Sequence, residues 1–150
     1  VITLAKGLGG GLPLGAVIAL GKYATALKPG SHGTTFGGNP ISCSAANAVI
    51  AEINRSGALA TNVAKGALIR NLISPISGVK EVRGRGLLIG IVLDAPKAKD
   101  IALWLQSAGF LVNAANDEVI RIAPAFIVTE KQILAFVRAF SDACEEVFHG

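Results

Sequence analysis

The apolar positions of this chain predict short strands and glycine-rich loops in its first forty residues. Apolar runs with β-branched residues occupy 1–5 and 14–20, and such runs are typical of buried strands. Between them, 7–13 consists mostly of glycine and proline, which predicts a loop. A brief helical turn is predicted at 23–27, and a second glycine-containing loop is predicted at 28–39.

Two helices are predicted after the second loop. Asn39 suits the position before a helix because its side chain accepts a backbone hydrogen bond, and Pro40 suits the first helical position. The pattern predicts one helix over 41–54, which ends before Gly57. A second helix is predicted over 58–73, where apolar residues recur about every 3.6 positions.

The remaining positions predict a compact α/β domain. Thr129 and Gln132 have the spacing of a reciprocal helix cap, so the last helix is expected to begin there. The stripe of apolar residues on this helix comprises Ile133, Val137, Phe140, Cys144 and Val147. Before it, strands are expected at 79–85, 87–93, 110–112 and 119–122, and a helix is expected at 98–108. The fold class is therefore α/β, and the first fifty-odd residues look like the edge of something larger.

Composition narrows the class of protein. Of the 150 residues, 51% are hydrophobic and 16% are charged, which excludes a disordered chain. The net charge is +4, but the basic residues are spread along the chain and there is only one Trp, so we expect no nucleic-acid partner. The longest apolar stretch, 8–20, is too short to span a bilayer, so we expect no membrane partner.

Two further features concern the context of the chain. Cys43 and Cys144 lack the spacing of metal or redox motifs, so we expect no metal site and buried thiols in a reducing cytoplasm. The chain contains no Met and opens on a strand-like run at 1–5. We therefore expect it to be the C-terminal part of a longer protein, with some of its active site in the preceding part.

Lys6 is the first candidate for chemistry, because it lies where a predicted strand ends and a glycine loop begins. Ligands bind at the carboxyl ends of strands in open α/β sheets. We expect apolar neighbours to desolvate this amine, which would make it nucleophilic toward an aldehyde. The alternative is a lysine that binds phosphate or is merely exposed.

The loop before Pro40 is the second candidate. It carries the hydroxyls of Thr34 and Thr35 and the ring of His32 just before a predicted helix start. Hydroxyls and free backbone N–H groups suit a phosphate or carboxylate. The alternative is a polar loop without a ligand. Neither glycine-rich loop has the spacing of a dinucleotide-binding or P-loop motif.

Arg121 is the third candidate, because it interrupts the apolar strand predicted at 119–122. Its planar fork of N–H donors matches a carboxylate, and the alternative is a structural ion pair with an acidic residue. Arg83 and Arg85 lie beside glycines in another predicted strand. We interpret them as solvated or paired, and contact with RNA is the less favoured alternative.

Together these segments resemble one known family. Residues 3–16 resemble the cofactor-lysine segment of class III pyridoxal-phosphate aminotransferases, and 30–40 resemble the phosphate loop of that family. Residues 82–87, 110–113 and 119–124 are similar to strands of its small domain. The resemblance covers the whole chain, although Ala125 and Phe126 depart from the family pattern.

The resemblance implies the fold type I of pyridoxal-phosphate enzymes. Residues 1–55 would form the end of the cofactor-binding large domain with an interdomain helix, and 56–150 would form the small α/β domain. Lys6 would be linked to pyridoxal 5′-phosphate and would later act as the catalytic base. Thr35 would bind the cofactor phosphate across a homodimer interface, and Thr34 would lie near the substrate. The cofactor carbonyl must then lie within reach of a desolvated Lys6 amine, close to both hydroxyls.

The resemblance also implies a reaction. Arg121 would hold a carboxylate of 2-oxoglutarate or glutamate, and the amino group would come from N-acetylornithine in arginine biosynthesis. Ornithine and 4-aminobutyrate are the alternative amine donors, and a small ligand-binding module over 58–150 without chemistry is the alternative class. The family's aspartate opposite the pyridine nitrogen is not evident here. We therefore expect the 150 residues alone to be inactive.

Overall fold

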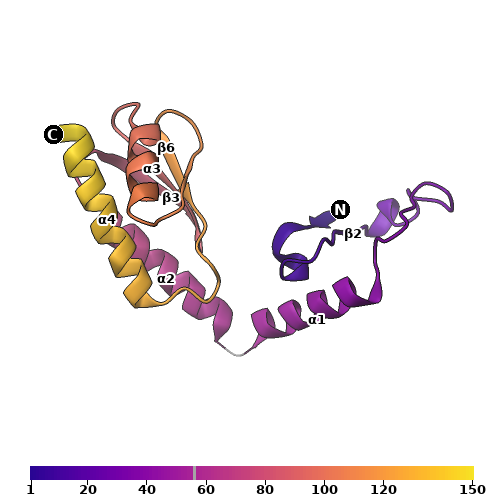
Figure 1. Ribbon diagram of the computed structural model, residues 1–150. Helices are drawn as coiled ribbons and strands as arrows, with labels where there is room; N and C mark the ends of the chain where they lie inside the picture. Colours follow the sequence, from indigo (N-terminus) through magenta and orange to yellow (C-terminus); the bar gives the residue numbers. More distant parts are fainter. Residues whose placement is uncertain (56) are drawn as a thin grey trace. The chain divides into compact units, whose positions relative to one another are not determined.

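The computed structural model describes residues 1–55 and 57–150 (Figure 1). It contains two compact units, Val1–Ala58 and Leu59–Gly150. Each unit has its own sheet: one of two strands in the first unit and one of four strands in the second.

The first unit contains a small antiparallel sheet. Strand β1 (Ile2–Leu4) pairs with β2 (Ala16–Ile18), and the short 3₁₀ helices η1 (Lys6–Gly9) and η2 (Gly21–Tyr23) follow the two strands. Both predicted strands are therefore present but shorter than expected. The helical turn predicted at 23–27 was wrong, because the turn of helix lies earlier, in η2.

These two strands are not buried, contrary to the prediction. The side chains of Ile2 and Val17 are 51% and 59% exposed. The reason is that each strand pairs only with the other, while α1 (Pro40–Asn54) packs against η1. A two-stranded sheet without a covering layer leaves its apolar side chains in contact with solvent.

The start of α1 follows the prediction. The Asn39 side chain accepts a hydrogen bond from the Ser42 backbone N–H at 2.9 Å, and its amide group donates to the Phe36 carbonyl at 2.9 Å. Pro40 is the first helical residue. The side chain of Asn39 thus ties the preceding loop to the helix that follows it.

The second unit is built on a fully antiparallel sheet with the strand order β3-β4-β6-β5. Its strands are β3 (Val79–Arg85), β4 (Leu88–Leu93), β5 (Asn113–Ala114) and β6 (Val119–Ile122). Three helices accompany them, α2 (Ala58–Ile73), α3 (Ala98–Ser107) and α4 (Glu130–His149). These elements confirm the predicted order of helices and strands.

One face of this sheet supplies the core. Ile89, Ile91 and Ile120 are fully buried and pack with residues of all three helices, including Phe140 of α4. Successive residues of a strand point to opposite faces. Gly90, between Ile89 and Ile91, and Arg121, next to Ile120, therefore lie on the other face, where the side chain of Arg121 is exposed.

The third predicted strand of this domain was misplaced. The ladder with β6 forms at 113–114 instead of 110–112. Phe110 and Val112 pack against the core, whereas the side chain of Leu111 between them is 87% exposed. The apolar residues at 110 and 112 thus contribute to the core without forming a strand. The backbone pairs with β6 only from Asn113 onward.

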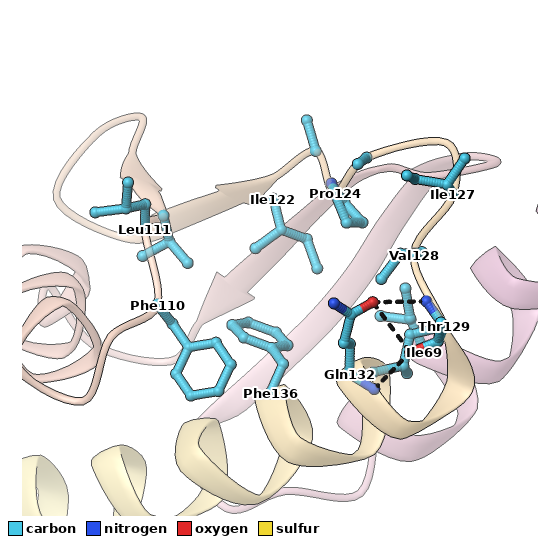
Figure 2. A pocket seen from close by; sticks show the side chains of 14 residues that line it. Ile69, Phe110, Leu111, Ile122, Pro124, Ile127, Val128, Thr129, Gln132 and Phe136 are labelled. Atoms are coloured by element: carbon cyan, nitrogen blue, oxygen red, sulfur yellow. Dashed lines mark hydrogen bonds between the residues drawn. The ribbon is translucent and has the colours of Figure 1, made fainter.

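The cap of the last helix is the one predicted. Thr129 Oγ1 accepts a hydrogen bond from the Gln132 N–H at 3.3 Å, and Gln132 Oε1 accepts one from the Thr129 N–H at 2.8 Å (Figure 2). This reciprocal pair satisfies two backbone donors that would otherwise lack partners at the helix start.

The two cysteines are free thiols. Burial raises the pKa of the Cys144 thiol to about 12, and the negative charge of Asp94 adds to the effect. Cys144 is therefore an inert core residue, whereas Cys43 on α1 is only partly covered. Within residues 1–55 and 57–150, no helix is long and apolar enough to cross a membrane.

Helix α2 lies in backbone contact with the β3–β4 turn. A Cβ atom on Gly66 would overlap the carbonyl group of Gly86. Glycine in the interior of a helix is less favourable than alanine by about 1 kcal/mol, but here only glycine permits the close approach of the two backbones.

We predict that Gly66→Ala destabilises the protein by about 1–3 kcal/mol, although alanine favours helix formation, because the turn must move away. Urea unfolding measures the effect. The opposite exchange at exposed Ala64 on the same helix, Ala64→Gly, is the control and costs only about 1 kcal/mol. A stabilised Gly66→Ala variant would contradict the close contact.

Candidate active site

Lys6 has a strained backbone. Its φ angle is 56°, and among the described residues no other non-glycine residue has a positive φ. The strain arises where β1 turns into η1, a turn closed by a hydrogen bond from the Leu8 N–H to the Ala5 carbonyl at 3.2 Å. Such conformations cost about 1–3 kcal/mol and concentrate at functional sites. The backbone conformation of Lys6 therefore indicates a functional position, independently of its side chain.

The Lys6 side chain is exposed, so the expected desolvation of its amine was wrong for this chain. No hydrogen bond or ion pair reaches it from residues 1–55 or 57–150. The turn after Lys6 contains Gly7, Gly10 and Gly11, which have no side chains that could cover it, and β1 before it pairs only with β2. The amine is thus open to a carbonyl compound from solvent.

The second loop places its threonines in a folded turn. Thr34 Oγ1 accepts a hydrogen bond from the Gly37 N–H at 3.2 Å, and a Cβ on Gly37 would overlap the Thr34 methyl group. Gly38 follows with a φ of 70°. The hydroxyl of Thr35 is exposed and has no hydrogen bond within the part of the chain that is described. A free hydroxyl on a glycine-supported turn suits a phosphate group.

We had expected Lys6 to lie close to the hydroxyls of Thr34 and Thr35. The structure does not bring them together within this chain. The loop joins α1 at Pro40, whereas η1 packs beside Val49, where the Val49 methyl lies 3.1 Å from a Cβ built on Gly10. Nine helical residues separate these points, which is about 13 Å along the axis. Figure 1 likewise shows the loop extending away from η1 within the first unit.

Arg121 lies in the middle of the four-stranded sheet. It is paired with Gly90 of β4 on one side and with Asn113 of β5 on the other. Its exposed side chain lies on the face opposite the core. Among the residues described, none forms an ion pair with it, so the alternative of a structural ion pair finds no support here. The guanidinium group is available to an external anion.

Gly90 was not singled out by the sequence analysis. The signal was present, because glycine in the interior of an apolar strand often marks a close approach of another group to the backbone. In the structure it separates Arg83 from Arg121 on the exposed face. A cavity of about 540 Å³ at the start of α4 was likewise not predicted from the sequence.

That cavity is apolar (Figure 2). Phe110, Ile122 and Phe136 supply much of its wall, and Phe110 and Phe136 meet edge to face with ring centroids 5.7 Å apart. Its polar side chains, Thr129 and Gln132, are hydrogen-bonded to each other in the helix cap. The cavity therefore holds no group for acid–base or nucleophilic chemistry, and none of the candidate residues lines it.

Comparison with protein families decides the assignment. The family model described as aminotransferase class-III matches residues 1–144. This chain belongs to that family. Class III aminotransferases are enzymes that use pyridoxal phosphate, so the expected family and fold class are confirmed.

Individual class III proteins are similar over almost the whole chain. The acetylornithine aminotransferase of Mycobacterium leprae is 52% identical over 141 residues, which are 93% of this chain and 35% of that protein. The acetylornithine aminotransferase of Corynebacterium efficiens is 45% identical over 148 residues, which are 98% of this chain and 36% of that protein. The chain thus spans just over a third of the length of these relatives.

Solved class III structures show the same fold. The ornithine aminotransferase of Toxoplasma gondii superposes with a TM-score of 0.86 at 28% identity, covering 97% of this chain and 36% of that one. In that structure PLP partially occupies the active site. The acetylornithine aminotransferase of Elizabethkingia anophelis superposes with a TM-score of 0.82 at 33% identity, covering 96% of this chain and 40% of that one.

The donor set in this class III chain fits pyridoxal phosphate. An aldehyde requires a primary amine, which Lys6 offers in exposed form at a strained turn. A phosphate requires hydroxyl and N–H donors, which the turn at Thr34 and Thr35 offers around Gly37. Both halves of the cofactor therefore have matching chemistry among the described residues.

Proposed function

We propose that this chain is the C-terminal part of an aminotransferase that moves an amino group from N-acetylornithine to 2-oxoglutarate, a step of arginine biosynthesis in the cytoplasm. The observation that carries the proposal is the strained backbone of Lys6 at the start of its glycine turn. The choice of amine donor is supported by the similarity to acetylornithine aminotransferases at 45–52% identity.

Lys6 is proposed to perform two tasks through one atom. Its Nζ would bind the aldehyde of the cofactor, and it would also take up and return the proton at the reacting substrate carbon. When bound, pyridoxal phosphate supplies an electron sink that stabilises the carbanion formed at that carbon. The positive φ of Lys6 restricts where the amine can lie, because few backbone conformations satisfy this turn.

Thr35 is proposed to bind the cofactor phosphate of a second copy of the chain, and Thr34 is proposed to lie near the substrate. This arrangement accounts for the separation of the loop from η1 within one chain. The turn holds Thr34 through the Gly37 N–H, while the Thr35 hydroxyl remains free to donate. The protein would then act as a homodimer with shared active sites.

Arg121 is proposed to bind the carboxylate that all substrates of the reaction have in common. Both N-acetylornithine and 2-oxoglutarate carry such a group, so one arginine serves both halves of the reaction. Its unpaired guanidinium in the centre of a rigid sheet supports this role. A charge-assisted, two-point hydrogen bond from Arg121 would fix the direction of the substrate.

We predict that borohydride reduction of the full-length holoprotein attaches a pyridoxyl group to Lys6, which peptide mass spectrometry detects. Lys6→Ala should lose the label, and Lys22→Ala in the same unit should keep it. Labelling of another lysine would refute the assignment. Absence of any label would favour the alternative of a ligand-binding module without chemistry.

We predict that Gly37→Ala weakens pyridoxal phosphate binding by about tenfold or more, because the added methyl overlaps Thr34 and displaces the hydroxyls. Equilibrium dialysis of the full-length protein measures the loss. Gly33→Ala in the same loop is the matched control, since no atom lies within 4 Å of a Cβ there. Equal effects of the two variants would contradict a phosphate role for this turn.

We predict that the full-length enzyme has a higher kcat/KM with N-acetylornithine than with ornithine or 4-aminobutyrate, with 2-oxoglutarate as acceptor. Steady-state assays with the three amines check this order. A preference for ornithine or 4-aminobutyrate would correct the substrate while retaining the family. The 150 residues alone should show no turnover.

A further inference from the structure

Two arginines flank a glycine in one row of the four-stranded sheet. The register pairs Arg83 of β3 with Gly90 of β4, and Gly90 in turn with Arg121 of β6. Residues paired across neighbouring strands point to the same face, so both side chains rise on the side opposite the core. Two strand spacings separate their Cα atoms by about 10 Å.

Gly90 has no side chain, so the Arg83 side chain can lie across it. A Cβ built there would lie 3.7 Å from Arg83 Cγ, 3.9 Å from Arg83 Nε and 3.8 Å from Val119 Cγ1. These distances show that the Arg83 side chain leans across Gly90, in the direction of β6. They also show that a methyl group fits at this position without a clash.

The two guanidinium groups are poorly compensated by acidic residues. Arg121 has no ion pair with any described residue. Arg83 has one contact, from Nη1 to Glu81 Oε2 at 3.8 Å, and both side chains are more than half exposed. An exposed pair at this distance contributes little. Two cations beside one glycine therefore favour an anion above it.

We propose that Arg83 is a second carboxylate-binding residue, which together with Arg121 holds one carboxylate of the substrate above Gly90. The inference rests on the proposed aminotransferase function and extends it to a residue that the sequence analysis had interpreted as solvated or paired. Two guanidinium groups offer a carboxylate more donors than its two oxygens can use, so charge and direction are both fixed. A methyl group at Gly90 would occupy part of this place.

The proposal gives Arg83 a role in recognition rather than in folding. Its side chain is 60% exposed. Arg85, two positions further along β3, lies on the same face opposite Leu88. Arg85 therefore has the same charge as Arg83 and lies on the same face, but it is paired with Leu88 and not with Gly90. It provides a matched control for any general effect of positive charge.

The test measures binding of glutarate, a dicarboxylate that lacks the groups for amino transfer, to the full-length holoprotein by isothermal titration calorimetry. We expect Arg83→Gln to raise the dissociation constant about tenfold, which is the effect of losing a charge-assisted contact. Arg83→Lys should recover part of the loss, and Gly90→Ala should weaken binding severalfold. Arg85→Gln should change binding less than twofold. Melting temperature and pyridoxyl labelling of Lys6 should remain unchanged in all four variants.

Two results would overturn the inference while leaving the proposed function intact. In the first, Arg121→Gln loses glutarate binding, but the dissociation constant of Arg83→Gln changes no more than that of the control variant Arg85→Gln. The other is unchanged binding in Gly90→Ala. Absence of glutarate binding to the unaltered holoprotein would overturn the inference together with the proposed acceptor. Absence of pyridoxyl labelling on Lys6 would instead refute the proposed function itself.

Discussion

The register between β4 and β6 is the constraint on which the second unit depends. Side chains of a strand alternate between two faces, so the pairing of Ile91 with Ile120 buries both against the helices. The same register places Gly90 beside Arg121 on the opposite face. A shift by one residue would bury the arginine and expose the isoleucines. Core formation and the position of the proposed carboxylate-binding groups therefore have one common cause.

The first unit is organised by glycine rather than by burial. The turn after Lys6 and the turn around Gly37 both rely on residues without side chains, and Lys6, just before the first turn, adopts a positive φ. Such segments have little apolar surface with which to stabilise a conformation. The Lys6 amine and the Thr35 hydroxyl remain accessible there for the same reason. In the proposed homodimer, a second copy would supply the covering surface.

Local sequence signals predicted the helices of this chain well. Asn39 and Pro40 begin α1, and Thr129 with Gln132 begins α4, because a cap depends on residues within one turn. Features that depend on distant residues were predicted less well. The exposure of Lys6 reflects a missing layer over β1, and the place of β5 reflects its partner in β6. The row at Gly90 required the register of three strands, which periodicity alone does not specify.

The contact of Gly66 with Gly86 has a mechanical consequence. Where two backbones meet without side chains between them, there is nothing compressible to absorb a displacement. We therefore expect helix α2 and the β3–β4 turn to keep their spacing, because any closer approach would bring backbone atoms into overlap. Arg83 lies three residues before Gly86, on the strand that leads into this turn, so the position of Arg83 depends on the same contact.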